Sequence, residues 1–175
     1  MSEYYLNTSN INEWVSVLKA GDKVYLSGTI FTARDAAHKR IVSIIQNEGE
    51  LPFELADSVI YYAGPTPQKN NLAIGSIGPT TSSRMDVFAP LLIQKGLKAM
   101  IGKGNRSSDV VDAMKAHTCI YFAAIGGAGA LYSRCVTQCD VVAFPELGCE
   151  SIKRLVVKEF PIVVAIDSQG NSLYT

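Results

Sequence analysis

The sequence predicts an α/β domain built on a parallel or mixed sheet with helical cover. Apolar segments of strand length alternate with amphipathic segments of helix length along most of the chain. A chain of 175 residues is long enough for one compact domain with a sizeable core. It shows no internal repeat, low-complexity tract or linker, so we expect a single domain over residues 1–175.

The expected strands are short apolar runs bounded by glycine, proline or polar residues. In chain order they cover residues 23–28, 58–63, 97–101, 118–125, 140–144 and 160–167. The run 58–63 ends at Gly64-Pro-Thr-Pro67, which cannot continue a strand ladder.

The expected helices lie between these strands. The first has Thr32 as its N-cap, Asp35 in its first turn and an apolar face at helical spacing that ends with Ile45. A second helix spans residues 84–95, where Pro90 either kinks the helix or marks the restart of its first turn. The last two cover residues 108–117 and a short segment that opens at residues 126–130.

Composition excludes several classes of function. The 16 Lys and Arg residues balance 16 Asp and Glu residues, and this lack of basic excess argues against binding to nucleic acid or to an anionic membrane. No apolar run reaches membrane-spanning length, and the N-terminus does not resemble a signal peptide, so we expect a cytoplasmic protein. Only 18% of the residues are charged, which favours a surface partly covered by a partner.

The four cysteines are Cys119, Cys135, Cys139 and Cys149. In a reducing compartment we expect them to be small buried side chains. The spacing of the last three invites an iron–sulfur or zinc interpretation, but it matches neither the paired spacing of zinc sites nor the ferredoxin patterns.

Two glycine-rich segments are weak motifs. Residues 102–107 lie between a strand and a helix, as a dinucleotide-binding loop does, but the segment ends in Ser and no acidic residue follows at the ribose-binding distance. Residues 126–129 lack the spacing altogether and indicate a closely packed turn.

Basic and hydroxyl residues recur where strands pass into helices, at Arg34, residues 80–84, Lys103 and Arg106. Ligands of open α/β sheets bind at the carboxyl ends of strands, so these residues predict a site for a small dianion. The alternative is that each cation is a solvated loop residue.

Several longer strings carry a family resemblance, in the order and spacing Gly28-Thr-Ile-Phe-Thr-Ala-Arg-Asp-Ala-Ala-His38, Tyr62-Ala-Gly-Pro-Thr-Pro67, Gly78-Pro-Thr-Thr-Ser-Ser-Arg-Met-Asp86, Met100-Ile-Gly-Lys-Gly104 and Ala123-Ala-Ile-Gly-Gly127. From about Lys23 to Tyr174 the chain resembles the β subunit of class I (iron–sulfur) fumarases and L(+)-tartrate dehydratases. The resemblance implies a swivelling β/β/α fold of three layers, with a mostly parallel central sheet, helices on one side and a second sheet on the other.

The resemblance also implies a partner. In the family, a four-iron four-sulfur cluster is ligated by three cysteines of the α part, so this chain would hold no metal and would be active only with its α subunit. We expect a hetero-oligomer of paired αβ units that hydrates fumarate to (S)-malate. The alternatives are the β subunit of an L(+)-tartrate dehydratase and, from another class, a non-catalytic carboxylate-binding domain.

Site roles follow from the same resemblance. Arg34, Arg84 and Lys103 match family residues that bind the substrate carboxylates, and Thr80 matches the proposed base for the C3 proton. Thr80 could instead be a helix N-cap or a hydrogen-bond donor to substrate. Asp35 and His38 lie on one helix face, where they could orient Arg34, with an acid–base role for Asp35 as the second option.

Overall fold

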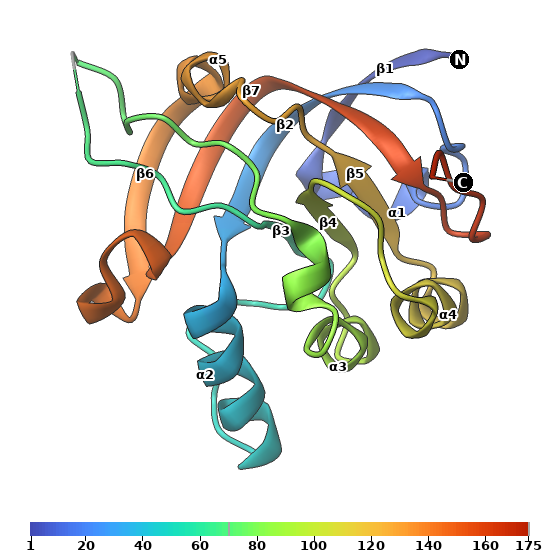
Figure 1. Cartoon of the computed structure of the whole chain (residues 1–175), viewed down its shortest axis with the longest axis horizontal. Helices are drawn as coiled ribbons and strands as arrows, with labels where there is room; N and C mark the ends of the chain where they lie inside the picture. The colour runs from blue at the N-terminus through green and yellow to red at the C-terminus, as the bar shows by residue number, and fades with distance from the viewer. Residues whose placement is uncertain (70, 175) are drawn as a thin grey trace.

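The computed structural model describes residues 1–69 and 71–174 (Figure 1). Its strands are β1 (Glu3–Asn7), β2 (Lys23–Thr32), β3 (Val59–Tyr61), β4 (Ala99–Gly102), β5 (Ile120–Ala123), β6 (Val136–Ala143) and β7 (Ile152–Ile166). Its α-helices are α1 (Ile11–Trp14), α2 (Asp35–Gln46), α3 (Ala89–Gln94), α4 (Ser108–His117) and α5 (Gly129–Cys135). Three 3₁₀ turns are η1 (Thr8–Asn10), η2 (Ser82–Met85) and η3 (Pro145–Glu150).

The strands form one mixed sheet that closes on itself. Strands β1 to β5 pair in parallel in chain order. Strand β7 runs antiparallel and pairs with β5, β6 and, over most of its length, β2. Because β2 and β5 are already joined through β3 and β4, β7 completes a barrel-like ring.

The core has two parts, one on each face of this sheet. Alternate residues of a strand point to opposite faces, so Tyr61 of β3 joins one cluster while Ile60 and Tyr62 join the other. The second cluster includes Ile41 of α2 and Leu92 of α3, and it also receives side chains from α4. Helices α2, α3 and α4 therefore cover one side of the sheet, as Figure 1 shows.

The helix predicted over residues 108–117 agrees with the structure. Helix α4 has the predicted bounds, and the Ser107 side chain accepts a hydrogen bond from the Val110 N–H. Pro90 lies in the first turn of α3, so the helix expected over residues 84–95 is a 3₁₀ turn followed by a restart at Ala89.

The predicted N-cap at Thr32 is wrong. Gly28, at φ +107°, does not end the strand, because the ladder to β7 continues past a bulge at this glycine. Thr32 is the last residue of β2, and its Oγ1 accepts a hydrogen bond from the Lys153 N–H. Helix α2 begins at Asp35, with Arg34 in the N-cap position.

The α/β class and the mixed sheet are confirmed, whereas the swivelling three-layer description is not. The resemblance implied a second sheet, whereas the seven strands of the described residues are hydrogen-bonded into one. Strand β1 was not expected, and β6 and β7 both begin earlier than their apolar runs indicate. No helix among residues 1–69 and 71–174 is long and apolar enough to cross a membrane.

Candidate active site

The carboxyl ends of the neighbouring parallel strands β2, β3, β4 and β5 lie at one edge of the sheet. Arg34 follows β2 and Lys103 follows β4. The loop after β5 lies beside the exposed Lys103 side chain, because a Cβ built at Gly126 would lie 4.0 Å from Lys103 Nζ. We call Arg34, Thr80, Arg84 and Lys103 the strand-end site.

Thr80 is held at this edge through its main chain. The Thr80 N–H donates to the Tyr62 carbonyl at 2.6 Å, and the Ser82 N–H donates to the Lys103 carbonyl at 2.9 Å. The segment before η2 therefore runs along the ends of β3 and β4. Thr81, not Thr80, occupies the N-cap position of η2, and its side chain makes no capping hydrogen bond. A helix cap is thus not the role of Thr80.

Arg84 is joined to the start of α2 by a two-point ion pair. Its Nε donates to Asp35 Oδ1 at 3.0 Å, and its Nη2 lies 3.0 Å from Asp35 Oδ2. The N-terminal end of a helix favours a carboxylate such as Asp35. Asp35 therefore contacts Arg84, whereas the sequence prediction paired it with His38 as a support for Arg34.

Arg34 faces a different carboxylate. Its Nε lies 3.7 Å from Oε1 of Glu150, the last residue of η3, and both side chains are about three-quarters buried. The Arg34 side chain also lies against Gly64, which follows β3. Sequence patterns gave no signal for Glu150 and marked Gly64 only as a strand end, because both come from segments that only the folded chain brings to Arg34.

His38 is fully buried behind Arg34. Its Nδ1 lies 2.8 Å from the Arg34 carbonyl oxygen, which can only accept, so Nδ1 carries the proton. Burial lowers the pKa of His38 to about 4, and the nearby Arg106 charge adds to this shift. His38 is therefore neutral at physiological pH and supports Arg34 through its backbone.

Arg106 does not belong to the strand-end site, contrary to its predicted place among the ligand-binding cations. Its side chain is fully buried, and its Nε donates to Asp86 Oδ1 at 2.7 Å. The guanidinium lies over the rings of Tyr62 and Tyr121, with centroid distances of 5.3 and 4.9 Å. Asp86 also accepts from the Ser107 N–H, so this cluster ties the loop after β4 to the segment that carries Arg84.

The cysteines do not fit an iron–sulfur cluster. No group of three or more His, Cys, Asp or Glu side chains that could hold a metal occurs within residues 1–69 and 71–174. Burial raises the pKa of Cys119 to about 12 and also raises the pKa values of Cys135 and Cys139, which disfavours the thiolates a cluster needs. The expected burial holds for Cys119 only, because Cys135 and Cys139 are half-buried and Cys149 is exposed.

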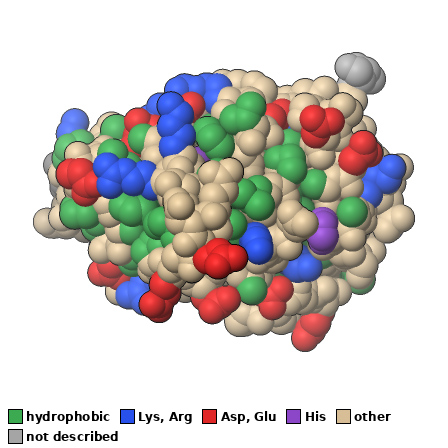
Figure 2. Space-filling model, turned by 90° about the horizontal axis from the view of Figure 1, so that it is seen from below, with side chains coloured by type: hydrophobic (Ala, Val, Ile, Leu, Met, Phe, Trp, Pro, Cys, Tyr) green, Lys and Arg blue, Asp and Glu red, His purple; other side chains and the backbone are tan. Residues whose placement is uncertain are grey.

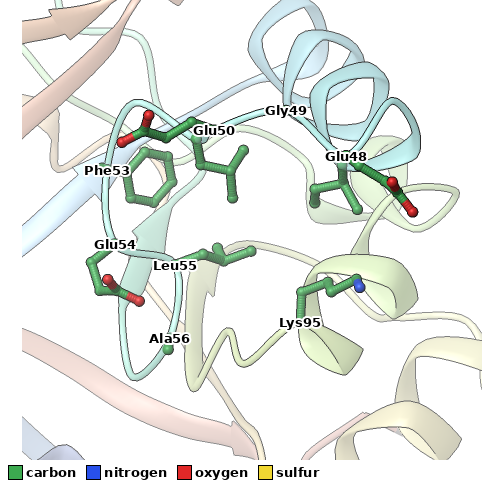
Figure 3. A pocket seen from close by; sticks show the side chains of 10 residues that line it. Glu48, Gly49, Glu50, Phe53, Glu54, Leu55, Ala56 and Lys95 are labelled. Atoms are coloured by element: carbon green, nitrogen blue, oxygen red, sulfur yellow. The ribbon is translucent and has the colours of Figure 1, made fainter.

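A cavity of about 480 Å³ lies at the other end of α2 from Arg34 (Figure 3). Its lining includes Glu48, Glu50 and Glu54 against the single cation Lys95, so its charge opposes a dianion. The helix-bearing face carries basic and acidic side chains intermixed, without a large patch of one sign (Figure 2). Of these two places, the strand-end site is the one whose charge suits a small dianion.

Comparison with known proteins identifies relatives along the whole chain. A family described as Fumarase C-terminus matches residues 1–175. A Methanocaldococcus jannaschii protein named as an L(+)-tartrate dehydratase subunit beta is 43% identical over 166 residues, covering 91% of this chain and 85% of that protein.

Longer relatives align with the chain over only part of their length. Fumarate hydratase 2 of Leishmania major is 38% identical over 94% of this chain, and the anaerobic class I fumarate hydratase of Escherichia coli is 40% identical over 87% of it. The chain spans only 29% and 28% of the lengths of these two proteins.

Proposed function

The chain belongs to the Fumarase C-terminus family, and from that membership we propose that it is the β subunit of a heteromeric hydro-lyase that interconverts fumarate and (S)-malate. The observation that carries the proposal is the strand-end site. The segments that carry two guanidinium groups, one ammonium group and one hydroxyl follow, or run along, the carboxyl ends of adjacent parallel strands. This is the edge where α/β sheets bind ligands.

The first task of the site is to bind a dianion. Guanidinium groups match the two oxygens of a carboxylate, and the Lys103 ammonium adds a point charge. We propose that Arg34 and Arg84 bind the substrate carboxylates and that Lys103 adds to the positive field. His38 supports Arg34 through the Arg34 carbonyl, and Asp35 supports Arg84 through the Arg84 guanidinium.

The second task is proton transfer at C3 of the substrate. We propose that Thr80 Oγ1 accepts this proton as an alkoxide, which the charges of Arg84 and Lys103 stabilise. The main-chain hydrogen bond to Tyr62 fixes Thr80 at the edge without using its hydroxyl. If Thr80 only donates a hydrogen bond to substrate, the acid–base role passes to Asp35 or to the partner.

The cofactor belongs to the partner in this proposal. The described residues do not fit a four-iron four-sulfur cluster, so we assign the cluster to an α subunit, with αβ units paired in a cytoplasmic hetero-oligomer. An L(+)-tartrate dehydratase is the second candidate, favoured by the archaeal relative of similar length.

Co-expression with the adjacent open reading frame, assembled without oxygen, tests the proposal. We expect the absorbance of fumarate to fall as it is hydrated, and we expect air to destroy this activity. The rate with L(+)-tartrate should be much lower. A faster rate with tartrate than with fumarate would make L(+)-tartrate dehydratase the first candidate and fumarate hydratase the second. Fumarate hydration by this chain alone, without iron, would overturn the division between subunits. Binding of (S)-malate with neither activity would indicate a non-catalytic carboxylate-binding domain.

A further inference from the structure

Each of the two arginines of the strand-end site has a carboxylate of the chain next to its Nε atom. Asp35 meets Arg84 along the edge formed by Nε and Nη2. Glu150 meets Arg34 at Nε. In both cases the chain uses the inner edge of the guanidinium.

The Arg34–Glu150 contact is closely enclosed. Arg34 Nε and Glu150 Oε1 are both buried, and neither atom has a hydrogen-bond partner among the described residues. Their separation of 3.7 Å exceeds the usual hydrogen-bond range. Each of these two buried atoms has the other as its ion-pair partner, so each depends on the other for its stabilisation.

Gly64 forms the opposite wall of the slot that holds Arg34. A Cβ at this position would lie 3.1 Å from Arg34 Cδ, 3.2 Å from Arg34 Nη1 and 2.9 Å from the Cys149 carbonyl oxygen. The last contact is with backbone, so a side chain cannot be accommodated by a simple rotamer change. The guanidinium is thus confined between Gly64 and the end of η3.

We propose that Glu150 is a positioning residue for Arg34, as Asp35 is for Arg84. Each arginine then presents to a dicarboxylate the nitrogen atoms that face away from its positioning carboxylate. Arg34 Nε is buried and has no hydrogen-bond partner among the described residues, whereas this is true of neither terminal nitrogen of Arg34. The inference rests on the proposed function for the identity of the ligand. It adds η3, between β6 and β7, to the elements that shape the site.

Glu146 provides a matched control on the same segment. It is exposed and pairs with Arg40 of α2, so its replacement removes one acid from η3 without touching Arg34. Glu150→Gln keeps the size and an acceptor oxygen of Glu150, whereas Glu150→Ala removes both. Comparison of Glu150→Ala with Glu146→Ala separates a general effect on η3 from a specific effect on Arg34.

Side-chain NMR of the full chain labelled with ¹⁵N-arginine tests positioning without any activity. We expect Glu150→Ala to raise the exchange rate of the Arg34 Nε proton about tenfold or more, since exchange reports local opening. Glu146→Ala should leave that rate unchanged, and Glu150→Gln should fall between them. An unchanged rate in Glu150→Ala, with the dispersed amide spectrum of a folded chain, would overturn the proposal.

Kinetics of the assembled αβ enzyme test the consequence for substrate. Glu150→Ala should raise KM for fumarate about tenfold, with kcat within about twofold, because binding and not chemistry is weakened. Glu150→Gln should recover part of this loss. A lower KM in Glu150→Ala would show that Glu150 competes with substrate, which overturns the proposal. If the unaltered assembly lacks activity, the proposed function fails, and the arginine exchange rates still decide the role of Glu150.

Discussion

At the scale of single residues, Thr80 stands out because its backbone is fixed while its side chain is only half-buried. A hydroxyl can accept a proton only as its alkoxide, so it needs positive charge close by. Arg84, which follows in η2, and Lys103, whose carbonyl accepts from Ser82, are the cations that the fold brings to this segment. The base role that we propose for Thr80 therefore depends on these two cations.

Replacement of Thr80 separates a base from a binding group. In the assembled enzyme we expect Thr80→Val to lower kcat at least about a hundredfold, with a small change in KM, since general base catalysis contributes roughly 10²–10⁴ in rate. Thr80→Ser keeps the hydroxyl and should retain much of the rate. A near-normal kcat in Thr80→Val would assign the base elsewhere.

Arg84 and Asp35 are expected to be energetically coupled. Arg84→Ala removes a guanidinium from the dianion and leaves the Asp35 carboxylate facing the site, so KM should rise about thirtyfold or more, or about 2 kcal/mol. Adding Asp35→Ala should restore part of the affinity by removing the unpaired charge. Purely additive effects, measured as KM in a double-mutant cycle, would indicate that Asp35 does not act through Arg84.

His38 gives the fold a defined dependence on pH. Its pKa of about 4 in the folded chain lies below the ordinary value of 6.5, so the unfolded chain takes up the proton first as pH falls. The contribution of neutral His38 to the free energy of unfolding is fully present above about pH 6.5. This free energy decreases by roughly 3 kcal/mol as the pH falls to 4. Denaturant unfolding at several pH values measures this slope.

The substitution His38→Gln should flatten the slope between pH 6.5 and 4. The matched control is His117→Gln, at the exposed end of α4, which should leave it intact. Asp22 and Asp167 also have lowered pKa values, but their ordinary pKa of 3.8 confines their effect to lower pH. A slope that persists in His38→Gln would assign it to other groups.

At the scale of elements, the Arg106 cluster joins two loops that carry site residues. Asp86 follows η2, and Arg106 lies between β4 and α4. Because this ion pair is buried, its geometry fixes the segment bearing Arg84 relative to the one bearing Lys103. Loops that form a binding site need such a rigid connection, since small displacements weaken both binding and catalysis.

Breaking the buried pair should cost far more than breaking an exposed one. Asp86→Asn leaves the Arg106 guanidinium without its counter-charge, so we expect a loss of about 3–5 kcal/mol in the free energy of unfolding. Asp140 and Arg154 form an exposed ion pair between β6 and β7, and Asp140→Asn should leave stability nearly unchanged. Equal losses in the two variants, measured by urea unfolding, would contradict the role assigned to the cluster.

Local signals predicted many of the elements and marked residues of the candidate site. The bounds predicted for α4 agree with the structure, and strand-to-helix positions marked Arg34, Arg84 and Lys103 as candidates, because connectivity alone brings strand ends to one edge. Burial could not be inferred in this way, so the fully buried Arg106 was grouped with the ligand-binding cations.

Long-range pairing explains the remaining differences. The early parts of β6 and β7 carry polar and charged residues, such as Thr137 and Lys153, and are strands because they pair with each other and with β2. Glu150 reaches Arg34 only through the same pairing, and a local sequence pattern cannot report it. Strand β1 is short and mostly exposed, so it lacked an apolar run to reveal it.

At the scale of the whole molecule, the balanced charge of the chain conceals a local arrangement. The 16 basic and 16 acidic residues cancel overall, yet two arginines and a lysine lie at the strand-end site. Acidic partners hold the arginines in place, with Asp35 on Arg84 and Glu150 on Arg34. Neutrality of the chain is thus compatible with a site for an anion.

The pairing of β7 with both β2 and β5 also determines when, during synthesis of the chain, the fold can be completed. Strands β1 to β5 can associate in the order in which they leave the ribosome, but the ring stays open until residues 152–166 have emerged. Until then β2 and β5 expose unpaired edges, which are aggregation-prone in a nascent chain. Glu150 emerges just before β7, so the last contact made to Arg34 forms only as the ring closes.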